Sequence, residues 1–284
     1  MKWLSRALAG LAVLAALAYG GITTYVYARQ GQIVYLPTHA IERTPRDYGL
    51  DYVELHLPVK RATGAAENIT AWWIPAPKPN GVSELFLHGN ARNMGAPLNL
   101  EKVVTLAQAG FNVLAIDYRG YGSSDGDHPY EAALYEDAGA ALDELERREP
   151  DAAKRLIHGH SLGGAVAIDL AMHRPEAAAL VIESSFDSML GMSTVRAAYR
   201  LLPIKLILTE RFDSIDKIAR IKLPVLFIHG NADPLVPARM SESLYTAATA
   251  SDKRLLLING GVHSNLHTFK QYIPAIRALV RPGN

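Results

Sequence analysis

The chain has 284 residues, of which 49% are hydrophobic and 20% charged, with a formal net charge of +1. This near-neutral charge, without a basic stripe, argues against nucleic acid as a main partner. The absence of cysteine excludes disulfides, a thiolate nucleophile and thiolate metal sites. The length suits one α/β domain of about 250 residues or two smaller domains.

The N-terminal stretch predicts a helix that spans a membrane. The run from Ala7 to Ala28 carries no charge, and as a helix it is long enough to cross the roughly 30 Å hydrocarbon layer. Tyr19, Tyr25 and Tyr27 lie near its far end, where aromatic residues occupy the membrane interface. We therefore expect residues 1–30 to form a retained anchor.

Two other interpretations of this stretch stay open. Ala16-Leu17-Ala18 resembles the small-residue site of a cleaved signal peptide, and a buried helix of a soluble protein is also compatible. The run stays apolar to Val26, which is longer than a signal peptide needs. Lys2 and Arg6 precede the run and favour a cytoplasmic N-terminus. Residues 31–284 are then extracytoplasmic, and periplasmic in a bacterium.

Residues 31–284 predict an α/β domain. Residues 52–57 and 68–74 alternate as an antiparallel strand pair, joined through the polar segment 60–67. Short apolar strands then alternate with helices, which predicts a mostly parallel sheet of about eight strands covered on both faces. The expected strands are 84–87, 112–116, 155–157, 179–182, 225–228 and 254–258, and the expected helices are 98–109, 131–148, 161–173, 237–249 and 266–280.

A G-x-S-x-G pattern from Gly159 to Gly163 joins a predicted strand to a predicted helix. This arrangement is typical of a nucleophile elbow, in which small flanking residues permit a tight turn that exposes the Ser161 hydroxyl. The free N–H groups at the start of the helix then point toward the reacting centre. The alternative without a catalytic role is a glycine-rich turn in which the serine caps the helix.

Serine is a poor nucleophile without a base, and the base needs a group that orients it. Asp233 and His263 each follow a later predicted strand, so the order serine, acid, histidine matches the α/β-hydrolase scaffold. We assign Ser161 as nucleophile, His263 as base and then acid, and Asp233 as orienting group. The alternative role for Asp233 is the N-cap of the helix that follows it. The backbone N–H groups of Leu162 and Asn90 are the expected oxyanion donors.

The other ionisable residues near strand ends have weaker claims to catalysis. His88, His158, His160 and His229 are expected to be structural. His267 follows His263 at a metal-ligand spacing but lacks a carboxylate partner, so we expect no metal and no cofactor. Arg92 is interpreted as an exposed loop residue or a charge facing the substrate. The alternative acids are Asp187, Asp213 and Asp216.

These motifs resemble the serine hydrolases of the α/β-hydrolase fold, and more narrowly the membrane-anchored ABHD-like group with an HGNAxN oxyanion loop. The resemblance runs from about Gln32 to the C-terminus and implies the triad Ser161, Asp233 and His263. Members of this group include lysophospholipid and monoacylglycerol lipases, depalmitoylases and bacterial esterases. Arg92 departs from the usual small residue. The motifs that carry the resemblance are residues 88–91, 117–122, 159–164, 229–233 and 261–263.

The insert at about 186–219 falls where this fold carries its cap. Its apolar residues are expected to pack mostly on the body, with a few lining an acyl pocket or touching the bilayer. We therefore expect hydrolysis of a small-molecule or lipid ester or thioester with an apolar acyl chain. The alternatives are a peptidase of the same fold and a catalytically silent, membrane-tethered scaffold. The apolar residues of the insert are Met189, Leu190, Met192, Tyr199, Leu201, Leu202, Ile204, Leu206, Ile207 and Leu208.

Overall fold

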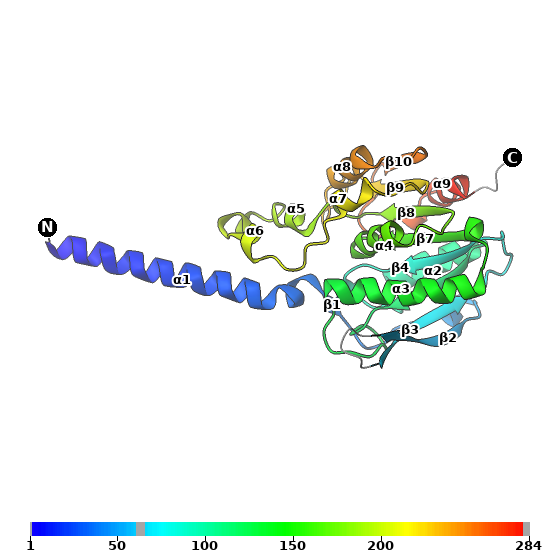
Figure 1. The fold of residues 1–284 in the computed structure, drawn as a ribbon, viewed down its shortest axis with the longest axis horizontal. Coiled ribbons are helices and arrows are strands. Elements are labelled where there is room, and N and C mark those ends of the chain that lie inside the picture. Colours follow the sequence, from blue (N-terminus) through cyan, green and yellow to red (C-terminus); the bar gives the residue numbers. More distant parts are fainter. Residues whose placement is uncertain (1, 61–65, 281–284) are drawn as a thin grey trace.

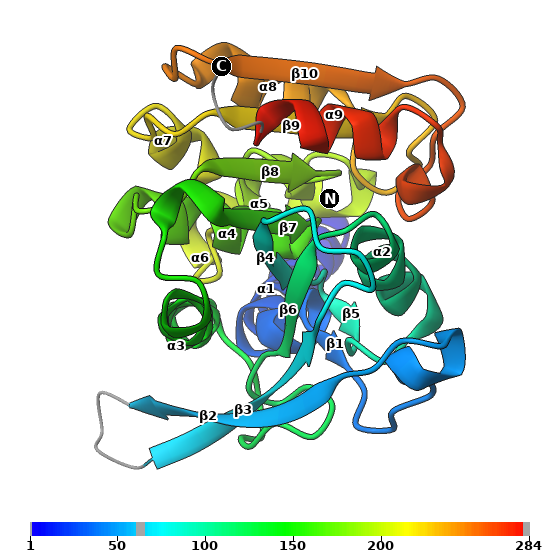
Figure 2. The ribbon, with the colours of Figure 1, turned by 90° about the vertical axis from the view of Figure 1, so that its right-hand side faces the viewer.

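The computed structural model describes residues 2–60 and 66–280. Its centre is an eight-stranded sheet in the order β10-β9-β8-β7-β4-β6-β3-β2 (Figure 2). From β6 to β10 neighbouring strands pair in parallel, whereas β3 is antiparallel to both β6 and β2. This confirms the predicted fold class. The strands are β2 (Val53–Lys60), β3 (Ala66–Ile74), β4 (Ser83–Leu87), β6 (Asn112–Asp117), β7 (Arg155–His160), β8 (Ala179–Glu183), β9 (Val225–Gly230) and β10 (Lys253–Ile258).

The sheet is buried on both faces by helices, as its uninterrupted apolar strands predict. On β4, Leu85 and Leu87 join one core cluster with residues of α3 and α4, while Phe86 joins the other cluster with residues of α2 and α9. Figure 2 shows the helices on either side of the sheet. The helices of the body are α2 (Pro97–Gln108), α3 (Glu131–Arg148), α4 (Leu162–His173), α8 (Arg239–Ala247) and α9 (Tyr272–Leu279), with short 3₁₀ turns at Pro45–Tyr48, Ala152–Lys154 and Leu266–Thr268.

Most predicted elements are observed with ends that differ by one to three residues, and two of the differences have a clear cause. The strand expected at 155–157 continues to His160, because its backbone still pairs with Glu183 of β8 there. The helix expected over 266–280 is broken into a 3₁₀ turn and α9, because Phe269 takes an extended conformation between them. Of the segment expected to join β2 and β3, residues 61–65 lie outside the described residues.

Helix α1 (Lys2–Val34) projects away from the body as a single long element (Figure 1). It is long and apolar enough to cross a membrane, and its most apolar stretch is not buried by the rest of the chain. The helix continues past residue 30, and Gln30 and Val34 in its last turns are buried. Strand β1 (Leu36–Pro37) follows and pairs in parallel with β5 (Ala91–Arg92).

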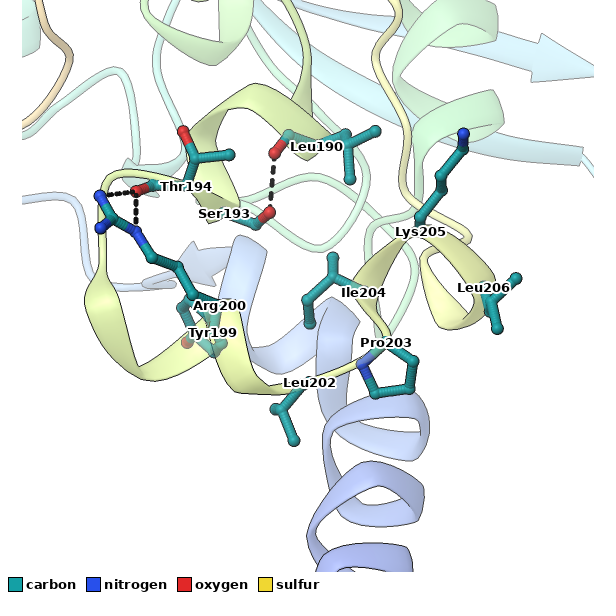
Figure 3. A pocket seen from close by; sticks show the side chains of 10 residues that line it. All are labelled: Leu190, Ser193, Thr194, Tyr199, Arg200, Leu202, Pro203, Ile204, Lys205 and Leu206. Carbon is teal, nitrogen blue, oxygen red and sulfur yellow. Dashed lines mark hydrogen bonds between the residues drawn. The ribbon is translucent and has the colours of Figure 1, made fainter.

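The insert between β8 and β9 overhangs the body on the side from which α1 leaves (Figure 1). It contains α5 (Met189–Ser193), a 3₁₀ turn (Ala197–Leu201), α6 (Ile204–Ile207) and α7 (Ser214–Ile218). A hollow between α5 and α6 is lined in part by Arg200, which donates to the Thr194 carbonyl at 3.1 and 3.2 Å (Figure 3). Leu201 and Leu206, which are 79% and 85% exposed, are the apolar residues of the described insert that pack least on the body.

Candidate active site

The turn that carries Ser161 is sharp and strained. Ser161 joins β7 to α4 with φ 56° and ψ −119°, a conformation that a residue with a side chain rarely adopts. A Cβ on Gly159 would lie 2.1 Å from the Gly163 carbonyl oxygen, and one on Gly163 would lie 2.0 Å from the Leu87 carbonyl oxygen. Glycine is therefore required where β7, α4 and β4 approach, which is the geometry expected of the elbow.

The structure brings the three predicted triad side chains together. His263 Nε2 lies 3.0 Å from Ser161 Oγ, and His263 Nδ1 lies 2.7 Å from Asp233 Oδ2. Asp233 follows β9 and His263 follows β10. The two loops meet where Gly230 and Gly261 pack so closely that a Cβ on Gly230 would lie 2.1 Å from the Gly261 carbonyl oxygen.

Asp233 is held as an anion by four donors. Its Oδ1 accepts from the N–H groups of Leu235 and Val236 at 2.8 and 3.0 Å, while Oδ2 faces His263 and His229, the latter at 3.2 Å. Burial alone would raise the pKa of Asp233, but hydrogen bonds from His229 and His263 hold it well below the usual value for aspartate. The residue is not the N-cap of α8, because that helix begins several residues later, at Arg239.

Two backbone N–H groups beside Ser161 are free to bind an oxyanion. Gly89 packs against Ser161, since a Cβ on Gly89 would lie 3.2 Å from the serine Cβ. In the described part of the chain, neither the Asn90 N–H nor the Leu162 N–H has a hydrogen-bond acceptor. The Asn90 carbonyl instead accepts from the Tyr121 hydroxyl at 2.8 Å. Both predicted donors are thus at the expected loop and helix end.

A buried polar network lies beneath the elbow, and sequence reasoning missed most of it. Lys102 of α2 is fully buried and donates to Glu183 at 2.7 Å, and Tyr272 donates to the other oxygen of Glu183 at 2.7 Å. His158 lies 2.6 Å from Glu84 and 3.3 Å from Glu183. Burial favours neutral His158, yet its hydrogen bonds to Glu183 and Glu84 raise its pKa to about 9.

The network ends on the loop that carries His263. Lys102 Nζ donates to the Ser264 carbonyl at 3.0 Å, and His160 Nε2 donates to the His263 carbonyl at 3.0 Å. Burial and the nearby Lys102 charge lower the pKa of His160 well below its usual value, so its ring is neutral at pH 7. A signal for this network was present in the sequence, because Glu183 ends an otherwise apolar strand.

The remaining candidates have structural contacts. His88 lies 3.3 Å from Asp117, and Arg92 pairs with Glu42 at 2.8 Å outside the pocket described below. His267 faces Glu101 at 3.9 Å, and no group of three potential metal ligands occurs within residues 2–60 and 66–280. His229 was expected to be structural only, but it also contacts Asp233. Among the described residues, Asp187, Asp213 and Asp216 make no contact with His263.

Ser161 and His263 open into a cavity of about 380 Å³. The walls come from α1, the oxyanion loop, the cap and the loop after β9. Apolar side chains dominate the lining, and the described lining contains no aspartate or glutamate. The lining residues are Val26, Gln30, Ile33, Val34, Leu36, Asn90, Ala91, Ser161, Leu162, Phe186, Met189, Met192, Ser193, Val195, Arg196, Tyr199, Ile204, Leu208, Leu235, Val236 and His263.

Comparison with known proteins agrees with this architecture. The profile of the family described as serine aminopeptidase, S33, matches residues 84–204 and 188–268. The uncharacterised protein MT2364 of Mycobacterium tuberculosis is 34% identical over 262 residues, covering 92% of this chain and 89% of its own. The protein bem46 of Schizosaccharomyces pombe is 33% identical over 239 residues, covering 81% and 78%.

A solved structure shares the fold at low sequence identity. The esterase Pf2001 of Pyrococcus furiosus superposes with a TM-score of 0.69 at 19% identity, covering 86% of this chain and 98% of the esterase. The fold and the site define a hydrolase of the α/β-hydrolase class. Within that class the chain belongs to the serine aminopeptidase S33 family, as its match over residues 84–268 shows.

Proposed function

We propose that the protein hydrolyses carboxylic esters or thioesters with apolar acyl chains through the triad Ser161, His263 and Asp233. The observation that carries the proposal is the continuous hydrogen-bonded chain from Ser161 Oγ through both nitrogens of His263 to Asp233. The acid in this chain stays ionised, which suits it to stabilise a histidine that gains a proton.

The reaction follows from this geometry. His263 Nε2 takes the Ser161 proton as Oγ attacks the acyl carbonyl carbon, and the N–H groups of Asn90 and Leu162 stabilise the resulting oxyanion. The bond to the leaving group then breaks as that group takes the proton from Nε2, which leaves an acyl-enzyme. A water molecule, deprotonated by His263, attacks the acyl-enzyme, and the carboxylic acid departs as Oγ regains a proton.

The cavity favours an apolar acyl group over a peptide. Its volume of about 380 Å³ and its apolar lining suit a hydrocarbon chain. An aminopeptidase must hold the ammonium terminus of its substrate, and buried ammonium groups require an opposing charge. The described lining holds the cation Arg196 but no aspartate or glutamate, so it offers no carboxylate to pair with an ammonium group. This argues for an ester or thioester despite the description of the family.

We further propose that α1 anchors the protein in a membrane, and that residues 31–284, which carry the catalytic site, lie on the extracytoplasmic side. The long exposed apolar helix supports an anchor, and Lys2 and Arg6 at its start, before the uncharged run, support this orientation. Cleavage after Ala18 is the competing possibility. N-terminal sequencing of the protein from its native membrane separates the two, since a cleaved signal would remove the first residues of α1.

The test of the proposed reaction compares ester, thioester and aminopeptidase substrates with the wild type and Ser161→Ala. We expect the wild type to hydrolyse acyl esters or thioesters, with preference for long apolar chains, and Ser161→Ala to lose at least about 10³-fold in kcat. Preference for aminoacyl amides would establish the peptidase alternative. A folded wild type with no hydrolysis of any class would favour a catalytically silent scaffold.

A further inference from the structure

The cavity over Ser161 has one wall that does not belong to the hydrolase body. Val26, Gln30, Ile33 and Val34 of α1 line the same cavity as Ser161 and His263. Their spacing of three, four and seven places them on one face of the helix. The helix that would anchor the protein therefore also contributes a surface to its reactive centre.

Gln30 fixes this wall against the cap. Its side-chain amide donates to the Ile207 carbonyl at 3.1 Å and to the Tyr27 carbonyl at 2.9 Å, and its oxygen accepts from the Thr209 N–H at 2.7 Å. Gln30 is buried, although most of α1 is exposed. A buried amide with all these bonds satisfied specifies one orientation of the helix, because rotation would leave polar groups unpaired.

The end of the wall is joined to the oxyanion loop. The Asn90 side-chain amide donates to the Val34 carbonyl at 2.7 Å, and the Leu36 N–H donates to the Asn90 carbonyl at 3.0 Å. The β1–β5 pairing continues this connection. Hydrogen bonds therefore join the oxyanion loop beside Ser161 directly to the end of α1 that lines the cavity.

The wall is long enough to contact part of a long acyl chain. From Val34 to Val26 the helix rises about 12 Å, and Met192 and Leu208 of the cap line the other side of the same cavity. A chain that is bound at its carbonyl by Ser161 can thus lie between α1 and the cap. Its distal carbons then lie toward the exposed, apolar part of α1.

We infer that α1 forms the acyl-binding wall of the enzyme and that the substrates are long-chain acyl lipids whose hydrocarbon chain lies along Val26, Ile33 and Val34. The inference rests on the proposed hydrolase function and adds a residue-level determinant of chain length. Cleavage of the chain after Ala18 would leave this wall in place, because all of its residues follow the cleavage site.

The test places a bulky side chain on the wall or on the opposite side of the helix. Val26→Trp fills the distal cavity, whereas Ala28→Trp adds the same ring at an exposed position about 200° round the helix. With full-length protein in detergent, the ratio of kcat/KM for palmitoyl to butyryl esters is measured. We expect Val26→Trp to lower this ratio at least about tenfold and Ala28→Trp to match the wild type. Equal ratios for all three proteins would overturn the inference.

A second measurement does not depend on turnover. Ser161→Ala protein is crosslinked with a palmitic acid that carries a terminal diazirine, in the presence or absence of excess palmitate. We expect labelling on peptides covering residues 26–34, and we expect excess palmitate to suppress it. This labelling should be lost when Val26→Trp is combined with Ser161→Ala, and retained when Ala28→Trp is combined with it. Labelling that excess palmitate does not suppress and that Val26→Trp does not reduce would refute α1 as the acyl-binding wall. Suppressible labelling without any wild-type hydrolysis would instead refute the proposed reaction alone.

Discussion

The side-chain amide of Asn90 donates a hydrogen bond of 2.7 Å to the main-chain carbonyl of Val34. Val34 ends α1, and Asn90 carries one of the two free N–H groups beside Ser161. The C-terminal carbonyls of a helix lack partners within the helix, so this contact satisfies one of them. It also fixes the position of a proposed catalytic donor relative to the proposed anchor.

Loss of this contact is expected to slow turnover. Asn90→Ala keeps the backbone N–H but removes the bond to Val34, so kcat should fall by about tenfold. This is less than the roughly 10²–10³ lost when an oxyanion donor is removed outright. Steady-state kinetics with a butyryl ester measure the change. Asn80→Ala, in an exposed loop before β4, is the matched control and should behave like the wild type. Unchanged kcat in Asn90→Ala would contradict this account of the oxyanion loop.

Lys102 is expected to position the His263 loop through its bond to the Ser264 carbonyl. Lys102→Met removes the lysine that pairs with buried Glu183, which should destabilise the protein by about 3–5 kcal/mol. Thermal unfolding measures this loss. Lys154→Met removes a lysine from an exposed pair with Asp151 at 3.5 Å, and it should cost much less.

A paired substitution separates stability from positioning. Lys102→Met with Glu183→Gln removes both charges, so we expect part of the stability to return. The Ser264 carbonyl still lacks its donor, and kcat should stay below the wild-type value at unchanged KM. Full recovery of kcat together with stability would show that Lys102 has no positioning role.

The stability of the fold is expected to decrease in mild alkali through His158. Its folded pKa of about 9 lies above the usual value near 6.5, so the stabilisation is complete below pH 6.5 and is lost as pH rises to 9. The change is of the order of 3 kcal/mol at most. Thermal melts from pH 6 to 9.5 test it against His158→Gln. The wild type should lose more stability over this range than the variant, and parallel curves would contradict the assignment.

The exposed cap residues are expected to contact the bilayer. Leu201 and Leu206 are 79% and 85% exposed, and Lys205 lies beside Leu206 on α6 (Figure 3). The rate of palmitoyl ester hydrolysis is measured in anionic vesicles and in detergent, and the ratio of the two rates is compared. Replacing both leucines by glutamate should lower this vesicle-to-detergent ratio several-fold. Leu98→Glu, an exposed leucine in α2, is the control and should leave the ratio unchanged. A ratio that is also unchanged in the cap variant would exclude bilayer contact.

The sequence predicts the sheet and the candidate triad because both depend on local signals. The strand at 155–157, the glycines around Ser161 and the helix that follows define the elbow within a few residues. Asp233 and His263 follow apolar strands, and parallel strands end at one edge of a sheet. The structure places their side chains in hydrogen-bond contact, as that reasoning expects.

The features that the sequence does not reveal depend on contacts between distant segments. The face of α1 that lines the cavity is as apolar as its other faces, so no periodicity distinguishes Val26 from Leu17 on the opposite face. Lys102 meets Glu183 only because the fold brings α2, far away in the sequence, to the residue that ends β8. The two-residue pairing of β1 with β5 is too short to produce an alternating pattern.

The central claim is that His263 and Asp233 make Ser161 a nucleophile, and covalent labelling tests it most directly. Full-length wild type, Ser161→Ala and Ser185→Ala, all in detergent, are treated with a fluorophosphonate, and the modified peptide is identified by mass spectrometry. Ser185 bonds the Ser161 carbonyl but does not contact His263, so its variant should retain the reactive group. We predict modification of Ser161 in the wild type and in Ser185→Ala, and none in Ser161→Ala. A folded wild type without modification, or equal modification of Ser161→Ala, would contradict the claim.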